Sequence, residues 1–173
     1  RLTDVTGVQT CALPIYEKQT IVHRDIKPAN IIILEQDQTS PKLIDFGLSK
    51  SLRQYYFSLT KTGTPMGTPY YMSPEQVNDA KRADHRSDIY SLGATFYHML
   101  AGKPPFHQFT QTLAILHAIL ANKLIPLAEL RPSLDSEIYR IVEKSMAFSA
   151  KDRYGSIDEF KTDLENFIKR KKK

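Results

Sequence analysis

Cysteine, tryptophan and long apolar runs are scarce or missing in this sequence, which has one cysteine, Cys11, and no tryptophan. With a single cysteine the chain can form no internal disulfide, which fits a reducing compartment. No apolar run reaches the roughly 18 residues that a membrane-spanning helix requires, so we expect the chain as given to be soluble. There is no internal repeat, and the basic tail is the only strongly biased stretch.

The rest of the composition is that of an ordinary globular domain. Of the 173 residues, 41% are hydrophobic and 25% are charged, which is enough apolar material for one core. The formal net charge is +5, and much of this excess lies in the tail, residues 169–173. The tail is either the solvated end of a helix or a basic stop before a membrane span in a longer protein.

Three short motifs carry most of the chemical information. Residues 23–30 read H-R-D-I-K-P-A-N, residues 45–47 read D-F-G, and residues 73–75 read S-P-E. An aspartate and a lysine two positions apart, followed by an asparagine and a second aspartate, suit phosphoryl transfer. One carboxylate can orient a hydroxyl, an ammonium can contact a phosphate, and an amide with a second carboxylate can hold a divalent metal.

The order and spacing of these motifs resemble the protein kinases, and residues 17–168 are similar to the C-terminal lobe of bacterial serine/threonine kinases of the eukaryotic type. The resemblance implies a mainly helical α+β fold with a short catalytic β-hairpin and without the amino-terminal lobe. It implies transfer of the ATP γ-phosphate to serine or threonine hydroxyls of proteins, with Mg²⁺ or Mn²⁺ as cofactor. It implies a cytoplasmic domain and no nucleic-acid partner. A membrane anchor and a kinase–kinase dimer remain open for the complete protein.

The first sixteen residues do not fit this resemblance. Residues 5–15 resemble, letter for letter, the conceptual translation of a widely used sequencing-library adapter, whereas a kinase has a long helix before its catalytic loop. Gly7 and Pro14 interrupt any apolar face at helical period. We therefore expect residues 1–16 to be an adapter-derived scar, the alternative being an unusual amino-terminal extension. On this interpretation the amino-terminal lobe is missing, and the chain alone is expected to be inactive.

The resemblance gives each polar residue of the cleft a chemical role. Asp25 is the predicted catalytic base, and Lys27 would contact the transferring phosphate, where lysine is typical of the serine/threonine branch. Asn30 and Asp45 would hold the metal through oxygen ligands, and Ile32 would pack against the adenine ring. Each residue also has a simpler reading, as a turn residue, an exposed lysine or a core isoleucine.

Other residues would support this cleft according to the resemblance. The Thr68 hydroxyl is expected to bond the catalytic aspartate and lysine, and Asp88 to accept hydrogen bonds from the catalytic-loop backbone. Asp88 could equally be an acidic residue favoured at a helix N-terminus. Glu75 and Arg153 would form a buried ion pair that holds the end of the activation segment. The remaining support residues are His23, Arg24, Phe46 and Gly47.

Residues 45–75 form a long segment with little periodicity and many Ser, Thr and Gly residues, which is typical of a functional or mobile loop. Its Thr60 and Thr62 resemble the paired-threonine site of bacterial kinases. We predict that the complete protein activates itself by phosphorylating Thr62, with Thr60 as the second candidate site, because a phosphate there could bind Arg24 in two places. The alternative is that both threonines are ordinary exposed loop residues.

Hydrophobic spacing predicts the surrounding elements. Residues 31–34 are expected to be a buried strand, residues 35–41 a turn and residues 42–44 the returning strand. The clearest helix is predicted over residues 87–101, apolar nearly all round and therefore central, with Gly102 as its C-cap. Its apolar positions are Ile89, Leu92, Gly93, Phe96, Met99 and Leu100.

Three more helices follow in the prediction. Residues 112–121 are expected to place Leu113, Leu116 and Leu120 on one face. Asp135 is expected to cap the next helix, and a capping box at Ser156 opens the last one. The predicted core residues of these two helices are Ile138, Ile141, Val142, Met146, Phe160, Leu164, Phe167 and Ile168.

Two other classes of protein share parts of this pattern. Small-molecule kinases that act on antibiotics or choline also use a loop aspartate and asparagine, but they lack D-F-G, the S-P-E closure and a long threonine-rich segment. A catalytically dead kinase-like binding module usually has lost the residue at position 25, 30 or 45, and all three are intact here. An ATP-turnover assay on the complete protein separates these classes.

Overall fold

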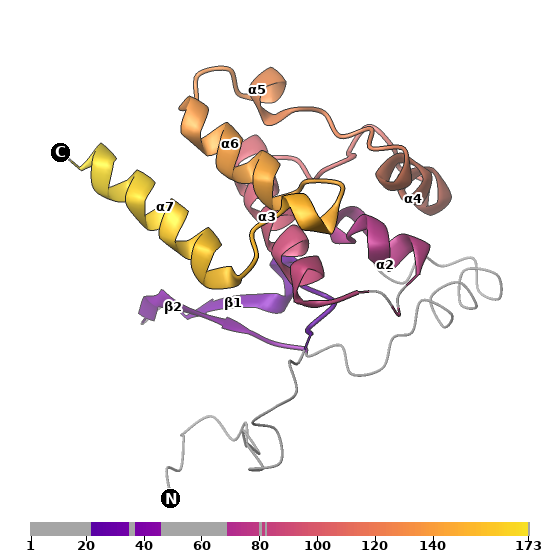
Figure 1. Ribbon diagram of the computed structural model, residues 1–173, viewed down its shortest axis with the longest axis horizontal. Helices are drawn as coiled ribbons and strands as arrows, with labels where there is room; N and C mark the ends of the chain where they lie inside the picture. The colour runs from indigo at the N-terminus through magenta and orange to yellow at the C-terminus, as the bar shows by residue number, and fades with distance from the viewer. Residues whose placement is uncertain (1–21, 35–36, 46–68, 80, 82, 173) are drawn as a thin grey trace, which may run out of the picture.

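A two-stranded antiparallel sheet lies below a group of helices in the computed structural model, as viewed in Figure 1. The structure describes residues 22–34, 37–45, 69–79, 81 and 83–172. The predicted sites Phe46, Gly47, Thr60, Thr62 and Thr68 lie outside these residues, as does the segment 1–21. The mainly helical fold with a short β-hairpin is confirmed.

The described elements follow the predicted order. They are η2 (Pro28–Asn30), β1 (Ile31–Leu34), β2 (Asp37–Leu43), η3 (Pro69–Tyr71), α2 (Pro74–Asn78), α3 (His85–Ala101), α4 (Thr112–Leu120), α5 (Leu127–Leu130), α6 (Ser136–Ser145), η5 (Ala150–Asp152) and α7 (Ile157–Lys171). Helix α3 runs through the middle of the helical group, with α6 and α7 on one side and α2 and α4 on the other (Figure 1).

The hairpin differs from the prediction in two respects. Strand β2 begins at Asp37, so the turn expected over residues 35–41 is too long. Pro41 lies within β2, which is possible because a strand with a free edge does not need every N–H. Strand β1 is not buried either: Ile32 is 42% exposed and Ile33 is 60% exposed. The apolar run indicates a strand, but its burial depends on a covering layer that no local pattern encodes.

Helix α3 begins and ends as its sequence predicts, within two residues. The Asp84 carboxylate caps the first turn by accepting a hydrogen bond from the Arg86 N–H at 2.8 Å, and Gly102 ends the helix in the left-handed conformation with φ of 72°. Its position at the centre is confirmed, because it packs against α5, α6 and η3. Met99 is an exception to the expected apolar face and is 73% exposed.

The face that helix α4 buries was predicted wrongly. Leu116 is buried as expected, but Leu113 is 69% exposed and Leu120 is 42% exposed. The residues that pack inward are Ile115, Leu116, Ala118 and Ile119. Almost every residue of this helix is apolar, so spacing alone fits several faces. The neighbouring elements α2 and η3 decide which face is covered.

Helices α6 and α7 complete the core. The Asp135 carboxylate caps α6 by accepting the Glu137 N–H at 2.9 Å, and the Ser156 hydroxyl caps α7 by accepting the Glu159 N–H at 3.2 Å. The capping box predicted at α7 is incomplete, because the Glu159 carboxylate accepts the N–H of Gly155 instead of the N–H of the N-cap residue, Ser156. Ile168, expected in the core, is 48% exposed.

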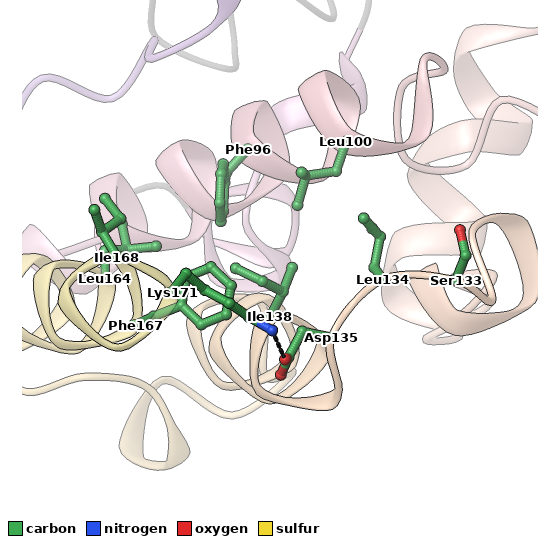
Figure 2. Close-up of a pocket in the computed structure, with 10 residues that line it drawn as sticks. All are labelled: Phe96, Leu100, Ser133, Leu134, Asp135, Ile138, Leu164, Phe167, Ile168 and Lys171. Atoms are coloured by element: carbon green, nitrogen blue, oxygen red, sulfur yellow. Dashed lines mark ion pairs between the residues drawn. The ribbon is translucent and has the colours of Figure 1, made fainter. Parts of the chain in front are cut away.

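An apolar groove runs between α3, α6 and α7, as Figure 2 shows. Phe96 and Leu100 of α3 form one wall, and Ile138 of α6 lies opposite them. The Lys171 ammonium reaches across α6 to the Asp135 carboxylate at 2.6 Å, so the groove has an ion pair beside its apolar walls.

Candidate active site

The loop of residues 22–30 is attached to helix α3 by one carboxylate. Asp88, in the first turn of α3, accepts the backbone N–H of His23 through Oδ2 and that of Arg24 through Oδ1, both at 2.8 Å. Burial raises the pKa of the Asp88 carboxyl above its ordinary value, although the two backbone hydrogen bonds act in the opposite direction. The central helix therefore sets the position of the loop directly before Asp25.

Asp25, Lys27 and Asn30 come together in this loop. The Lys27 ammonium donates to both carboxylate oxygens of Asp25, at 3.0 and 2.8 Å. The Asn30 amide nitrogen donates to the Asp25 backbone carbonyl at 2.7 Å and to its carboxylate at 3.1 Å. The short 3₁₀ turn η2 makes this possible, because it brings position 30 back towards position 25. The Asp25 carboxylate is thus oriented by two donors.

The hairpin brings Asp45 to the same region. Ile31 pairs with Leu43 in the ladder, and the Ile44 N–H donates to the Asn30 carbonyl at 2.9 Å. The buried His23 ring joins the loop to the end of β2, because its Nε2 lies 3.1 Å from the Ile44 carbonyl oxygen. Asn30 and Asp45 therefore stand at adjacent ends of the two strands.

The donor atoms at this point fit a hard divalent cation. Asn30 is buried, and its amide nitrogen is turned to Asp25, which leaves the amide oxygen on the opposite side. Asp45 is exposed and adds a carboxylate. Mg²⁺ takes such oxygen ligands and completes its shell with phosphate and water. The described residues contain no group of three or more His, Cys, Asp or Glu side chains that could hold a metal unaided.

An ion pair joins the partly buried Glu75 to the buried Arg153. The Arg153 guanidinium donates to both oxygens of Glu75, at 2.7 and 2.8 Å, and its side chain is fully buried. The Ser87 hydroxyl donates to the same carboxylate at 2.6 Å. Burial would raise the pKa of Glu75, but the hydrogen bonds from Arg153 and Ser87 outweigh it and hold the pKa below its usual value. The pair ties α2 to the segment after α6.

Sequence reasoning missed Gln76. Its side-chain nitrogen donates to the Arg24 carbonyl at 2.9 Å, so α2 contacts the catalytic loop. The signal that could have found it is Ser73 followed three residues later by Gln76, the pattern of a capping box, which the structure contains. Ile32 is the residue that the resemblance places against the adenine ring. It lies in β1, two residues after Asn30, and its side chain is partly exposed.

Comparison with known proteins agrees with these motifs. The family model described as "Protein kinase domain" matches residues 7–164. This match begins inside residues 1–16, for which an adapter origin remains a prediction.

Three bacterial relatives show the degree of similarity. The chain is 40% identical over 148 residues to a protein named tyrosine-protein kinase MasK of Myxococcus xanthus, covering 86% of this chain and 22% of that protein. It is 36% identical over 157 residues to a probable serine/threonine-protein kinase PknB of Bifidobacterium longum, covering 91% and 22%. It is 33% identical over 164 residues to serine/threonine-protein kinase PknB of Mycobacterium tuberculosis, covering 95% and 26%. The chain thus spans about a quarter of the length of these curated relatives.

Proposed function

Because the chain belongs to the protein kinase domain family, we propose that the complete protein transfers the γ-phosphate of ATP to serine or threonine hydroxyls of other proteins. The observation that carries this proposal is the contact of Asp25 with Lys27 and Asn30, beside the strand end that bears Asp45. A carboxylate, an ammonium and a pair of oxygen ligands in one region are the groups that phosphoryl transfer requires.

The residues of the loop have different tasks in the proposed reaction. As the acceptor oxygen bonds to the γ-phosphorus and the bond to the β–γ bridging oxygen breaks, Asp25 takes the hydroxyl proton and ADP leaves. Lys27 donates to the oxygens of the transferring phosphate, and for this it must share or leave its ion pair with Asp25. Asn30 keeps the Asp25 carboxylate in one orientation throughout. We propose that the Thr68 hydroxyl forms hydrogen bonds with Asp25 and Lys27.

Asn30 and Asp45 are the residues proposed to hold Mg²⁺ or Mn²⁺. The metal, when bound, would neutralise charge on the nucleotide phosphates. The role of these two side chains is to place their oxygen atoms at the strand ends, next to Asp25. Ile32, on the same hairpin, is proposed to pack against the adenine ring.

The acceptor amino acid has two candidates. Lys27 favours serine and threonine, because lysine at this position is typical of that branch, and two of the three relatives described above are named serine/threonine kinases. A relative that is 40% identical is named a tyrosine kinase, which makes tyrosine the second candidate. Their products differ chemically, so the two can be separated directly.

The test is phosphate transfer by the complete purified protein from γ-labelled ATP to itself and to a generic protein substrate, followed by hydrolysis and identification of the phosphoamino acids. We expect phosphothreonine and phosphoserine, and their absence in the Asp25→Ala variant. Phosphotyrosine alone would replace the proposed acceptor. Nucleotide binding without any transfer would identify a kinase-like binding module instead of an enzyme.

A further inference from the structure

The side chain of Gln76 has a defined orientation in the interior. It is 6% exposed, and its oxygen accepts the Ser73 N–H at 3.1 Å and the Ser73 hydroxyl at 3.0 Å. Its nitrogen donates to the Arg24 carbonyl at 2.9 Å. Exchanging the two amide atoms would set a nitrogen against an N–H donor and an oxygen against a carbonyl, so the contacts permit one orientation.

The carbonyl that Gln76 contacts belongs to the peptide group directly before Asp25. The N–H of the same peptide group, on Asp25, donates to His23 Nδ1 at 3.3 Å. The preceding Arg24 N–H is held by Asp88. Arg24 has a φ angle of 65°, a conformation that is unfavourable for residues other than glycine and needs such external support. The carbonyl and the N–H of the peptide group directly before Asp25 are therefore both held by side chains.

We propose that Gln76 is a positioning residue that holds the Arg24–Asp25 peptide group, so that the start of α2 sets the direction of the Asp25 carboxylate. The proposal rests on the proposed kinase function and assigns a role that the motifs alone do not give to this glutamine. Gln76 thus joins the S-P-E segment to the catalytic loop, whereas the neighbouring Glu75 joins the same segment to Arg153, after α6. Gln76 contacts the backbone beside the base and does not act on the substrate.

The alternative is that Gln76 serves only as a helix cap for α2. Gln76→Glu separates the two roles, because a carboxylate can still accept both Ser73 hydrogen bonds but offers no donor to the Arg24 carbonyl. Position 76 is buried and faces the Arg24 carbonyl, so we expect the introduced carboxyl to have a pKa above the ordinary value of about 4.3. Its protonation at lower pH restores an O–H donor at that point. A positioning role therefore gives the variant a distinct pH profile, which a capping role does not.

The experiment measures kcat, the KM for ATP and thermal unfolding of the complete protein and its Gln76→Glu variant between about pH 6 and 9. Ser156→Ala is the matched control, since it removes the cap of α7 far along the chain from the loop. We expect kcat to fall about tenfold at high pH, with the KM for ATP changed less than about twofold. The deficit relative to the unchanged protein should shrink as the pH falls. Ser156→Ala should lower stability without this effect on kcat.

Hydrogen exchange of the amides at residues 23–27 provides a second measurement that does not depend on activity. We expect faster exchange in Gln76→Glu than in the unchanged protein or in Ser156→Ala. Unchanged exchange, or a kcat within twofold at every pH, overturns the positioning role. If the unchanged protein transfers no phosphate, the proposed function fails, and exchange alone then decides whether Gln76 holds the loop.

Discussion

Two residues of the candidate active site have backbone conformations that their side chains disfavour. Arg24 has a φ angle of 65° and Asp45 one of 57°. Such conformations cost on the order of 1–3 kcal/mol each. At Arg24 the cost is opposed by hydrogen bonds at both its N–H and its carbonyl. Phe106 and Asn122 share the conformation outside the motif loops, so positive φ alone does not mark a site. Arg24 and Asp45 differ from these two residues in their position. The backbone of Arg24 directs the Asp25 carboxylate that follows it, and the backbone of Asp45 directs its own carboxylate.

Phosphorylation of Thr62, with Thr60 second, is predicted to activate the complete protein. Arg24 is exposed next to Asp25, so a phosphate on the segment could bond its guanidinium and order the loop. We expect phosphate on Thr62 in active protein, by mass spectrometry. The variant with alanine at both Thr60 and Thr62 should lose about tenfold or more of its activity. The reason is that it cannot form the charge-assisted hydrogen bonds between a phosphate and Arg24. Full activity in that variant, or phosphate on neither residue, would refute the prediction.

At the scale of elements, the sequence predicts well where local chemistry decides. Gly102 and Asp135 mark helix ends because a left-handed residue and a capping carboxylate are local requirements. The exposed faces of α4 and β1 could not be predicted, because they depend on which elements cover them. Gln76 was missed for a similar reason: its partner, Arg24, lies 52 positions earlier in the chain.

Gly93 allows α3 and α6 to approach each other closely. A Cβ atom at this position would lie 2.2 Å from the Ser145 hydroxyl oxygen and 2.8 Å from its Cβ. Alanine favours a helix by about 1 kcal/mol over glycine, but the clash should outweigh this. We expect Gly93→Ala to lower the free energy of unfolding by about 1–3 kcal/mol in denaturant titrations. In the Ser145→Gly background the loss should shrink; an equal loss in both backgrounds would contradict the packing explanation.

The Glu75–Arg153 ion pair should make stability depend on pH. Because the folded protein lowers the pKa of Glu75, the stabilisation is present above the unfolded pKa of about 4.3 and is lost as the pH falls through the lower folded value. Thermal unfolding of the protein and of Glu75→Gln should therefore converge in acid and differ at neutral pH, with the variant less stable there. A stability difference that does not change with pH would exclude this contribution.

At the scale of the whole molecule, the groove between α3, α6 and α7 leaves apolar side chains such as Phe96 and Leu100 at a surface of the described part of the chain. No described helix is long and apolar enough to cross a membrane. The candidate active-site residues belong to one lobe of the kinase fold, and this sequence contains no glycine-rich phosphate loop of the form G-x-G-x-x-G.

The 173-residue chain by itself is predicted to transfer no phosphate at a useful rate and to self-associate. Kinases use a glycine-rich loop to cover the ATP phosphates, and no such pattern occurs in these 173 residues. Apolar groove walls favour aggregation. Size-exclusion chromatography and a labelled-ATP assay on the purified chain check both points. Kinase activity of the chain that Asp25→Ala abolishes would show that the interpretation is wrong.

The most direct test of the central claim compares Asp25→Asn with Asp45→Asn in the complete protein, by measuring turnover and the affinity for Mg²⁺–ATP. Asp25 is proposed to act on the acceptor hydroxyl, so Asp25→Asn should lower kcat by about 10²-fold or more and leave nucleotide affinity within about twofold. Asp45→Asn should weaken Mg²⁺–ATP binding by about tenfold or more, a loss of about 1.4 kcal/mol or more. Equal losses of nucleotide affinity in the two variants would contradict the assignment of the base to Asp25 and of the metal to Asp45.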